Sequence, residues 1–165
     1  MNIIKEAQRV IIEESNALLS LADSLNEQFD LACKEIRKAR KVIVSGVGKS
    51  GLIGKKIAAT FSSVGIPSLF LHPVEALHGD LGIVEKDDVT LLLSKSGSTN
   101  ELLLLFPYLK KRTKIISLTS NKDSYLAQNS DIRIHIPIIK EACPIDLAPT
   151  SSTTSTLALV DAMAA

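Results

Sequence analysis

Apolar residues recur with helical periodicity through the first part of the chain. This spacing predicts two helices, which we expect to be separated near Asn26. The apolar positions are Ile3, Ile4, Ala7, Val10, Ile11, Leu18, Leu21, Ala22, Leu25, Phe29, Ala32 and Ile36. We therefore expect residues 1–40 to form N-terminal helices.

From Lys41 onward, short β-branched runs alternate with helical stretches, which is typical of repeated β-α-β units around a parallel sheet. The predicted strands are Val42–Ser45, Ser68–His72, Asp88–Ser94, Lys114–Thr119 and Ile132–Ile136. The predicted helices cover residues 50–64, 99–110, 124–129 and 151 to the end. The sequence therefore predicts one domain over residues 1–165, in which an α/β core over 41–165 forms a three-layer αβα sandwich with a five-stranded parallel sheet.

The composition fits one soluble globular domain. Of the 165 residues, 45% are hydrophobic and 22% are charged, which allows a sizeable core. The formal net charge of +1 gives no reason to expect nucleic acid or an anionic membrane as a partner. We interpret the basic run from Lys34 to Lys41 as the solvated face of a helix. An acidic ligand must therefore be bound by a local site.

Cysteine usage and short apolar runs predict a cytoplasmic protein. Cys33 and Cys143 lack the C-x-x-C spacing and no signal peptide precedes them, so we expect free thiols in a reducing compartment. The longest apolar runs, such as Leu102–Phe106, are far shorter than the ~20 residues that a membrane-spanning helix needs.

In an open parallel sheet, ligands bind beyond the carboxyl ends of the strands. One candidate loop there is Gly46–Gly51, which has the letters of a dinucleotide-binding fingerprint. That fingerprint expects an acidic residue about 20 positions on, where His72 stands, and a nucleotide-hydrolysing P-loop expects glycine in place of Ile43. We therefore favour neither a dinucleotide-binding site nor a nucleotide-hydrolysing P-loop. Gly48, Lys49 and Ser50 instead suit an anion at a helix N-terminus, although the glycines could serve only a tight turn.

A second loop, from Leu93 to Glu101, carries several hydroxyl groups around one glycine. A helix cap alone would explain only Thr99 or Asn100. Hydroxyls and first-turn amides can together bind a phosphate group, so we predict a phosphate site formed by Ser94, Ser96, Ser98 and Thr99. Glu101 would lie near the ligand, or it would only stabilise the helix dipole.

Four motifs occur in order along the chain: G-V-G-K-S-G, L-H-P-V-E-A-L-H-G-D-L-G, S-K-S-G-S-T-N-E and K-E-A-C-P-I-D-L-A-P-T-S-S-T-T. Together they resemble the arabinose-5-phosphate isomerase (KpsF/GutQ-like) family of the sugar isomerase (SIS) superfamily, over essentially the whole chain. The resemblance implies interconversion of ribulose 5-phosphate and arabinose 5-phosphate through an enediol, as an entry step to the Kdo sugar of lipopolysaccharide or capsule. It also implies a cytoplasmic homotetramer with no required cofactor.

The same resemblance assigns functional roles to four residues, namely Lys49, His78, Glu101 and Glu141. We favour Glu141 as the base, made more basic by burial, and Lys49 as the group that stabilises the enediolate. His78 would open the sugar ring or orient the substrate. Two further hypotheses remain: a sugar-phosphate-binding module without catalysis, and an isomerase of another phosphosugar.

The family resemblance also points to substrate contacts near Gly65 and Ile66, and to zinc at His72. The histidines His72 and His78 and the thiol of Cys143 lack the spacing of a metal site, so we favour a simple strand-end histidine at position 72. Family members usually continue into two CBS modules and place another functional histidine after the last helix. Because the chain ends within an apolar helix that lacks a cap, we interpret it as truncated.

Overall fold

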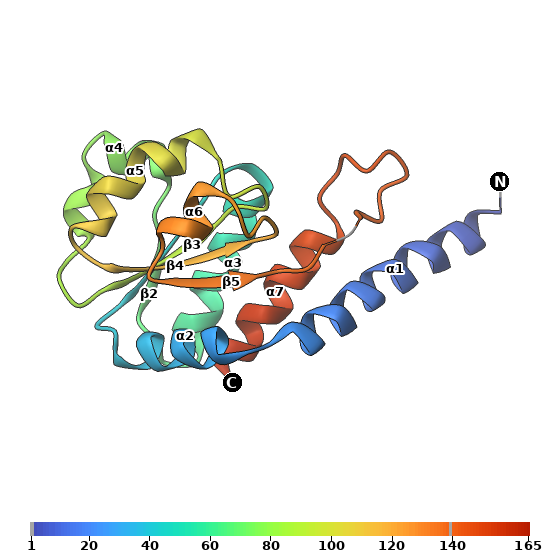
Figure 1. The fold of residues 1–165 in the computed structure, drawn as a ribbon, viewed down its shortest axis with the longest axis horizontal. Coiled ribbons are helices and arrows are strands. Elements are labelled where there is room, and N and C mark those ends of the chain that lie inside the picture. The colour runs from blue at the N-terminus through green and yellow to red at the C-terminus, as the bar shows by residue number, and fades with distance from the viewer. Residues whose placement is uncertain (1, 139) are drawn as a thin grey trace.

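A five-stranded parallel sheet forms the centre of the protein (Figure 1). The computed structural model describes residues 2–138 and 140–165. The strands are β1 (Val42–Gly46), β2 (Ser68–Phe70), β3 (Val89–Leu93), β4 (Lys114–Thr119) and β5 (Ile132–His135). Their order across the sheet is β2-β1-β3-β4-β5, so the direction of winding reverses between β1 and β3. The predicted α/β fold with five parallel strands is confirmed.

Helices cover both faces of the sheet (Figure 1). They are α1 (Ile3–Ser24), α2 (Glu27–Lys38), α3 (Gly48–Ser63), α4 (Pro73–Leu77), α5 (Asn100–Lys110), α6 (Tyr125–Asn129) and α7 (Ser151–Ala164), with one 3-10 helix, η1 (Asp80–Ile83). Residues of α2, α3 and α7 pack with one apolar cluster, and residues of α4, α5 and α6 pack with the other. All residues of β1 and β3 are buried because both of their faces are covered.

The two N-terminal helices meet at the predicted position. The side chain of Asn26 caps α2 by accepting a hydrogen bond from the backbone N–H of Gln28 at 2.9 Å. The second half of α1 packs along α7, whereas its first half extends away from the sheet (Figure 1). None of the helices within the described ranges has both the length and the apolar composition that a membrane crossing requires.

The sequence prediction was wrong at the end of β2. This strand ends at Phe70, and His72 caps a short helix instead of extending the strand. The imidazole Nδ1 of His72 accepts a hydrogen bond from the backbone N–H of Val74 at 3.3 Å, and Pro73 occupies the first helical position. Neither α4 nor η1 was predicted, because helices this short show no apolar periodicity. The other predicted ends lie within two residues of the observed ones.

Candidate active site

A small cavity opens at the carboxyl ends of β3 and β4. It encloses about 50 Å³, which is room for roughly four water molecules. Its lining comes from the start of α3, the loops after β3 and β4, the chain that follows β5, and the first turns of α7. The lining residues are Ser50, Ile53, Leu93, Ser94, Lys95, Leu118, Thr119, Ser120, Ile136, Pro149, Ser152, Thr153 and Thr156. The site therefore lies where the fold predicts ligand binding.

The loop after β3 is held against the loop after β4 by close backbone contact at Gly97. Gly97 has a φ of +65°, and a Cβ atom there would overlap Oγ of Ser124. Its carbonyl accepts a hydrogen bond from the backbone N–H of Leu126 at 3.2 Å. Only glycine fits this position, so the loop conformation depends on it.

Two hydroxyl groups of this loop form a hydrogen bond with each other. Oγ of Ser94 lies 2.8 Å from Oγ1 of Thr99 and accepts a hydrogen bond from the backbone N–H of Gly97 at 3.0 Å. Thr99 precedes α5, yet its side chain does not cap the helix. Ser96 and Ser98 are exposed. Of the four predicted hydroxyls, Ser94 alone lines the cavity, and the first-turn N–H groups of α5 face the same edge of the sheet.

The glycine loop before α3 also approaches the cavity. A Cβ atom on Gly51 would lie 2.9 Å from the carbonyl oxygen of Gly46, so the helix starts in close contact with the end of β1. The helix receives no side-chain cap from Val47, which leaves its N-terminus suited to an anion. Ser50 lines the cavity, whereas Lys49 beside it is exposed.

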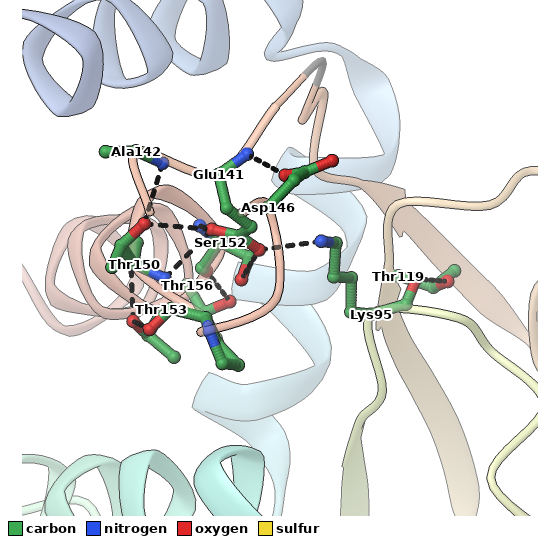
Figure 2. Close-up of polar contacts among 10 residues, drawn as sticks. Lys95, Thr119, Glu141, Ala142, Asp146, Thr150, Ser152, Thr153 and Thr156 are labelled. Carbon is green, nitrogen blue, oxygen red and sulfur yellow. Dashed lines mark hydrogen bonds and ion pairs between the residues drawn. The ribbon is translucent and has the colours of Figure 1, made fainter. Parts of the chain in front are cut away.

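The carboxylate of Glu141 lies at the N-terminus of α7, and the residue is almost fully buried, with 1% of its surface exposed. Figure 2 shows donors converging on its carboxylate from α7 and from Lys95. Oε2 accepts hydrogen bonds from the backbone N–H groups of Thr150 at 2.9 Å and Ser152 at 3.1 Å, and from Oγ1 of Thr150 at 3.3 Å. Oε1 accepts from Oγ of Ser152 at 2.5 Å and from Nζ of Lys95 at 2.7 Å. The carboxylate acts as the anionic cap of the helix.

The predicted rise in the basicity of Glu141 does not match this environment. Burial raises the pKa of the carboxyl group, but the ion pair with Lys95 and the hydrogen bonds from Ser152 and Thr150 together outweigh burial and lower the pKa to about 2. With these donors in place, Glu141 is therefore a stable carboxylate and a weak base.

Sequence reasoning missed Lys95, Thr150 and Ser152 as parts of this site. Lys95 stands between two of the predicted phosphate-binding serines, and Thr150 and Ser152 belong to the T-S-S-T-T run after Glu141. The hydroxyl-rich composition of both segments was a usable signal. The contact between Lys95 and Glu141 could not be predicted from the sequence, because the tertiary fold brings together residues that are 46 positions apart.

The other residues that the family resemblance singled out do not line this cavity. Lys49 and His78 are exposed and Glu101 is half-buried, and their side chains make no hydrogen bond or ion pair with any residue that the structure describes. Gly65 and Ile66 lie between the C-terminal end of α3 and the start of β2, at the opposite edge of the sheet. The structure thus does not bring Gly65 and Ile66 to the cavity.

A zinc site at His72 receives no support from the geometry. Its Nδ1 accepts the N–H of Val74, and its ring meets Phe70 edge-on with centroids 6.4 Å apart. Across residues 2–138 and 140–165, no three histidine, cysteine or acidic side chains gather closely enough to hold a metal ion. Zinc at this position stays a prediction that a direct metal analysis must test.

The arrangement combines an anion-binding edge with a buried carboxylate. The N-termini of α3, α5 and α7 all meet at the carboxyl edge of the sheet, and hydroxyl groups surround the cavity between them. Such N-termini stabilise negative charge. This edge of the sheet can therefore stabilise the negative charge of a phosphate group close to the carboxylate of Glu141.

Comparison with known proteins identifies the family of this chain. A family model described as SIS domain matches residues 35–165. The chain is 48% identical to the arabinose 5-phosphate isomerase KdsD of Pseudomonas aeruginosa and to a probable arabinose 5-phosphate isomerase of Haemophilus influenzae. Each match covers 99% of this chain, but only 51% and 49% of those two proteins. The chain thus spans about half the length of these curated relatives.

A solved structure shares the fold closely. The structure of the c3406 protein of Escherichia coli CFT073 in complex with arabinose 5-phosphate superposes with a TM-score of 0.94 at 43% sequence identity. The match covers 99% of this chain and 90% of that one.

Proposed function

Because this chain belongs to the SIS domain family and is homologous to arabinose 5-phosphate isomerases over nearly its whole length, we propose that it isomerises a phosphosugar. The specific reaction we propose interconverts D-ribulose 5-phosphate and D-arabinose 5-phosphate. The single observation that carries the proposal is the buried carboxylate of Glu141 beside a hydroxyl-lined cavity at the N-termini of α3 and α7. The complex of the c3406 protein with arabinose 5-phosphate supports the choice of substrate.

The proposed mechanism begins with an open-chain sugar whose phosphate group binds at the loop after β3. Hydroxyl groups of Ser94 and its neighbours, together with the N-terminus of α5, would neutralise the phosphate. Glu141 would then remove a proton from one of the two carbons that exchange the carbonyl group and return it to the other, while a second proton passes between the oxygens on those two carbons. The negative charge on the enediolate oxygen requires a nearby cation, and Lys49 is the residue we propose for it. Glu101 and His78 would orient the substrate or open its ring.

Arabinose 5-phosphate formed in this way would supply Kdo biosynthesis, as we inferred from the sequence. Location in the cytoplasm and assembly into a homotetramer are further parts of the proposal. The reaction moves protons between adjacent carbons and transfers no electrons to an acceptor, so we propose that it needs no cofactor.

A panel of phosphosugars tests the proposed substrate. The purified chain is incubated with arabinose 5-phosphate, ribose 5-phosphate, glucose 6-phosphate and a hexulose 6-phosphate, and ketose or aldose formation is followed by NMR spectroscopy. We expect conversion of arabinose 5-phosphate to exceed that of the others by at least about tenfold, the order expected when one misplaced group disrupts binding. Preference for a hexulose phosphate would assign the chain to a different isomerase, and binding without any turnover would favour a non-catalytic sensor.

A further inference from the structure

Lys95 connects the two halves of the candidate site. Its backbone carbonyl is fixed on the loop after β3 by hydrogen bonds from Oγ1 of Thr119 at 3.0 Å and from the backbone N–H of Ser120 at 2.9 Å. Its side chain extends across the cavity edge to Oε1 of Glu141 at 2.7 Å (Figure 2). The backbone of Lys95 is therefore anchored, whereas the ammonium group at the end of its extended side chain can move.

The two partners differ greatly in their contact with solvent. The side chain of Lys95 is 47% exposed, whereas that of Glu141 is 1% exposed. Glu141 keeps four hydrogen bonds from Thr150 and Ser152 that do not involve Lys95. The carboxylate can therefore lose the ammonium group and still remain bound in place at the N-terminus of α7.

The donors around Glu141 make its carboxylate a weak base. Removing a proton from a carbon next to a carbonyl group requires a carboxylate of at least ordinary basicity. Each charged or hydrogen-bonded donor stabilises the anion and lowers its affinity for a proton. Proton transfer by Glu141 is therefore favoured only after one of the strong donors leaves.

We propose that Lys95 is a positioning residue with two alternative partners: it binds Glu141 when no ligand is present, and it binds the phosphate group of a sugar phosphate when one enters. The inference rests on the proposed function, because it assumes that a phosphorylated ligand enters beside Ser94. The exchange couples substrate binding to the release of Glu141 as a base.

Charge explains the direction of the exchange. A phosphate monoester carries close to two negative charges at neutral pH, whereas Glu141 carries one. Lys95 stands next to Ser94 on the predicted phosphate-binding loop, and both residues line the cavity. A lysine side chain has a flexible four-carbon stem and can follow the larger charge. The loss of the cation and the arrival of a second anion both raise the pKa of Glu141.

Other charged groups near Glu141 do not replace Lys95. Oδ1 of Asp146 accepts a hydrogen bond from the backbone N–H of Glu141 at 2.7 Å and adds negative charge. On α1, the guanidinium of Arg9 donates to the carbonyl of Ala142 but is paired with Glu6 and Glu13. Lys95 is thus the cation in direct contact with the carboxylate among the residues that the structure describes.

The test is a titration of the Glu141 carboxyl carbon by NMR spectroscopy, with inorganic phosphate as the probe. It compares the unchanged protein with Lys95→Met and Lys95→Arg, and uses Lys111→Met at the far end of α5 as the control. Without phosphate, Glu141 should stay charged to the lowest pH at which the protein remains folded. Inorganic phosphate carries about one negative charge in the acid range where Glu141 titrates. Saturating phosphate should still raise the pKa of Glu141 by about one unit or more, because the departure of the Lys95 ammonium group and the arrival of an anion both disfavour the carboxylate.

The variants separate positioning from a structural role. Lys95→Met should raise the pKa of Glu141 without phosphate and weaken phosphate binding about tenfold, as expected for loss of one charge-assisted hydrogen bond. Lys95→Arg and Lys111→Met should behave like the unchanged protein. In kinetics, Lys95→Met should raise KM more than it lowers kcat, and it should move the acid limb of the pH profile to higher pH.

Three results would overturn the inference. They are an unchanged Glu141 titration when phosphate is bound, a Lys95→Met protein that titrates like the unchanged one, and a failure of phosphate to bind. The comparison with and without phosphate needs no variant, so it holds even where a variant fails to fold. The titration also needs no turnover. A protein that shows these shifts but isomerises no phosphosugar would refute the proposed activity and retain the assignment of Lys95 as an anion-responsive partner of Glu141.

Discussion

At the scale of single residues, the environment of Glu141 links its proposed role as a base to the stability of the protein. A buried carboxylate is costly unless its charge is compensated, and here the N-terminus of α7, two hydroxyl groups and Lys95 compensate it. The same contacts that hold the side chain in place also keep it ionised. A change in its protonation must therefore change the free energy of unfolding.

The pH dependence of stability follows from the lowered pKa. Glu141 titrates at about 2 in the folded protein, against about 4.3 in an unfolded chain. The unfolded chain thus takes up the proton first as the pH falls. The stability that Glu141 contributes should be complete above about pH 5 and should be lost between pH 5 and 2. Urea unfolding midpoints should fall more steeply over this range in the unchanged protein than in Glu141→Gln. Parallel curves for the two proteins would contradict this account of Glu141.

Lys49 offers a cleaner test of function than Glu141, because it is exposed and its side chain makes no hydrogen bond or ion pair with the described residues. Lys49→Met should change the free energy of unfolding by less than about 0.5 kcal/mol. If Lys49 stabilises the enediolate, kcat should fall by roughly a hundredfold or more. Steady-state kinetics and urea unfolding of the same preparation measure both quantities. Unchanged turnover would remove Lys49 from the mechanism.

The candidate site could be predicted from the sequence only in part. The loops of Ser50 and Ser94 were found from glycine and hydroxyl composition, because such loops end parallel strands and begin helices. Glu141 was found through its family motif, but its pKa was expected to move in the wrong direction. The donors that decide that pKa come from Lys95 and from α7, and no pattern along the chain reveals which residues will meet across a cavity.

At the scale of elements, the loop between β3 and α5 depends on one glycine. Gly97→Ala would place a Cβ atom in contact with Ser124, at a positive φ that side chains disfavour. The left-handed conformation and the overlap together should cost about 2 kcal/mol or more, and phosphate binding should weaken because Ser94 and Lys95 shift. Gly82→Ala is the matched control, since a Cβ atom there has no neighbour within 4 Å and φ is not positive. Urea unfolding and phosphate titration check both variants, and equal behaviour of the two would refute the role of Gly97.

Element positions were predictable where the apolar pattern was long. The strands β1, β3 and β4 are buried runs of β-branched and leucine residues, and α2 begins at Asn26, a residue type that caps helices. The pattern made β2, a partly buried edge strand, two residues too long, and it missed α4, whose single turn is set by His72 and Pro73. Short elements at the edge of a sheet bury too few side chains to leave a periodic signal.

At the scale of the whole molecule, α1 presents an apolar surface with no cover from the described residues. Ile4, Ile11, Ile12 and Leu19 are 57% to 69% exposed along this helix. A groove between α1 and α7 is lined by Leu18, Leu21, Ala22, Leu25, Ala158, Leu159 and Ala162. Apolar surface of this extent is typical of contact regions between proteins, and it supports the predicted homo-oligomer.

Self-association through α1 can be measured directly. Ile11→Asp places a charge on the exposed apolar stripe and should shift the sedimentation coefficient toward that of a monomer. Ser20→Asp, at an exposed polar position of the same helix, should leave assembly unchanged. A monomeric unchanged protein, or an Ile11→Asp protein that assembles normally, would contradict the proposed contact.

The most direct test of the proposed function is the conversion of ribulose 5-phosphate by this chain in deuterated water, followed by proton NMR spectroscopy. A carboxylate base exchanges its proton with solvent, so the account predicts arabinose 5-phosphate that carries deuterium at C2. Glu141→Gln should slow its formation by about a hundredfold or more. Bound ribulose 5-phosphate that is never converted, or a product formed equally fast by Glu141→Gln, would contradict the account.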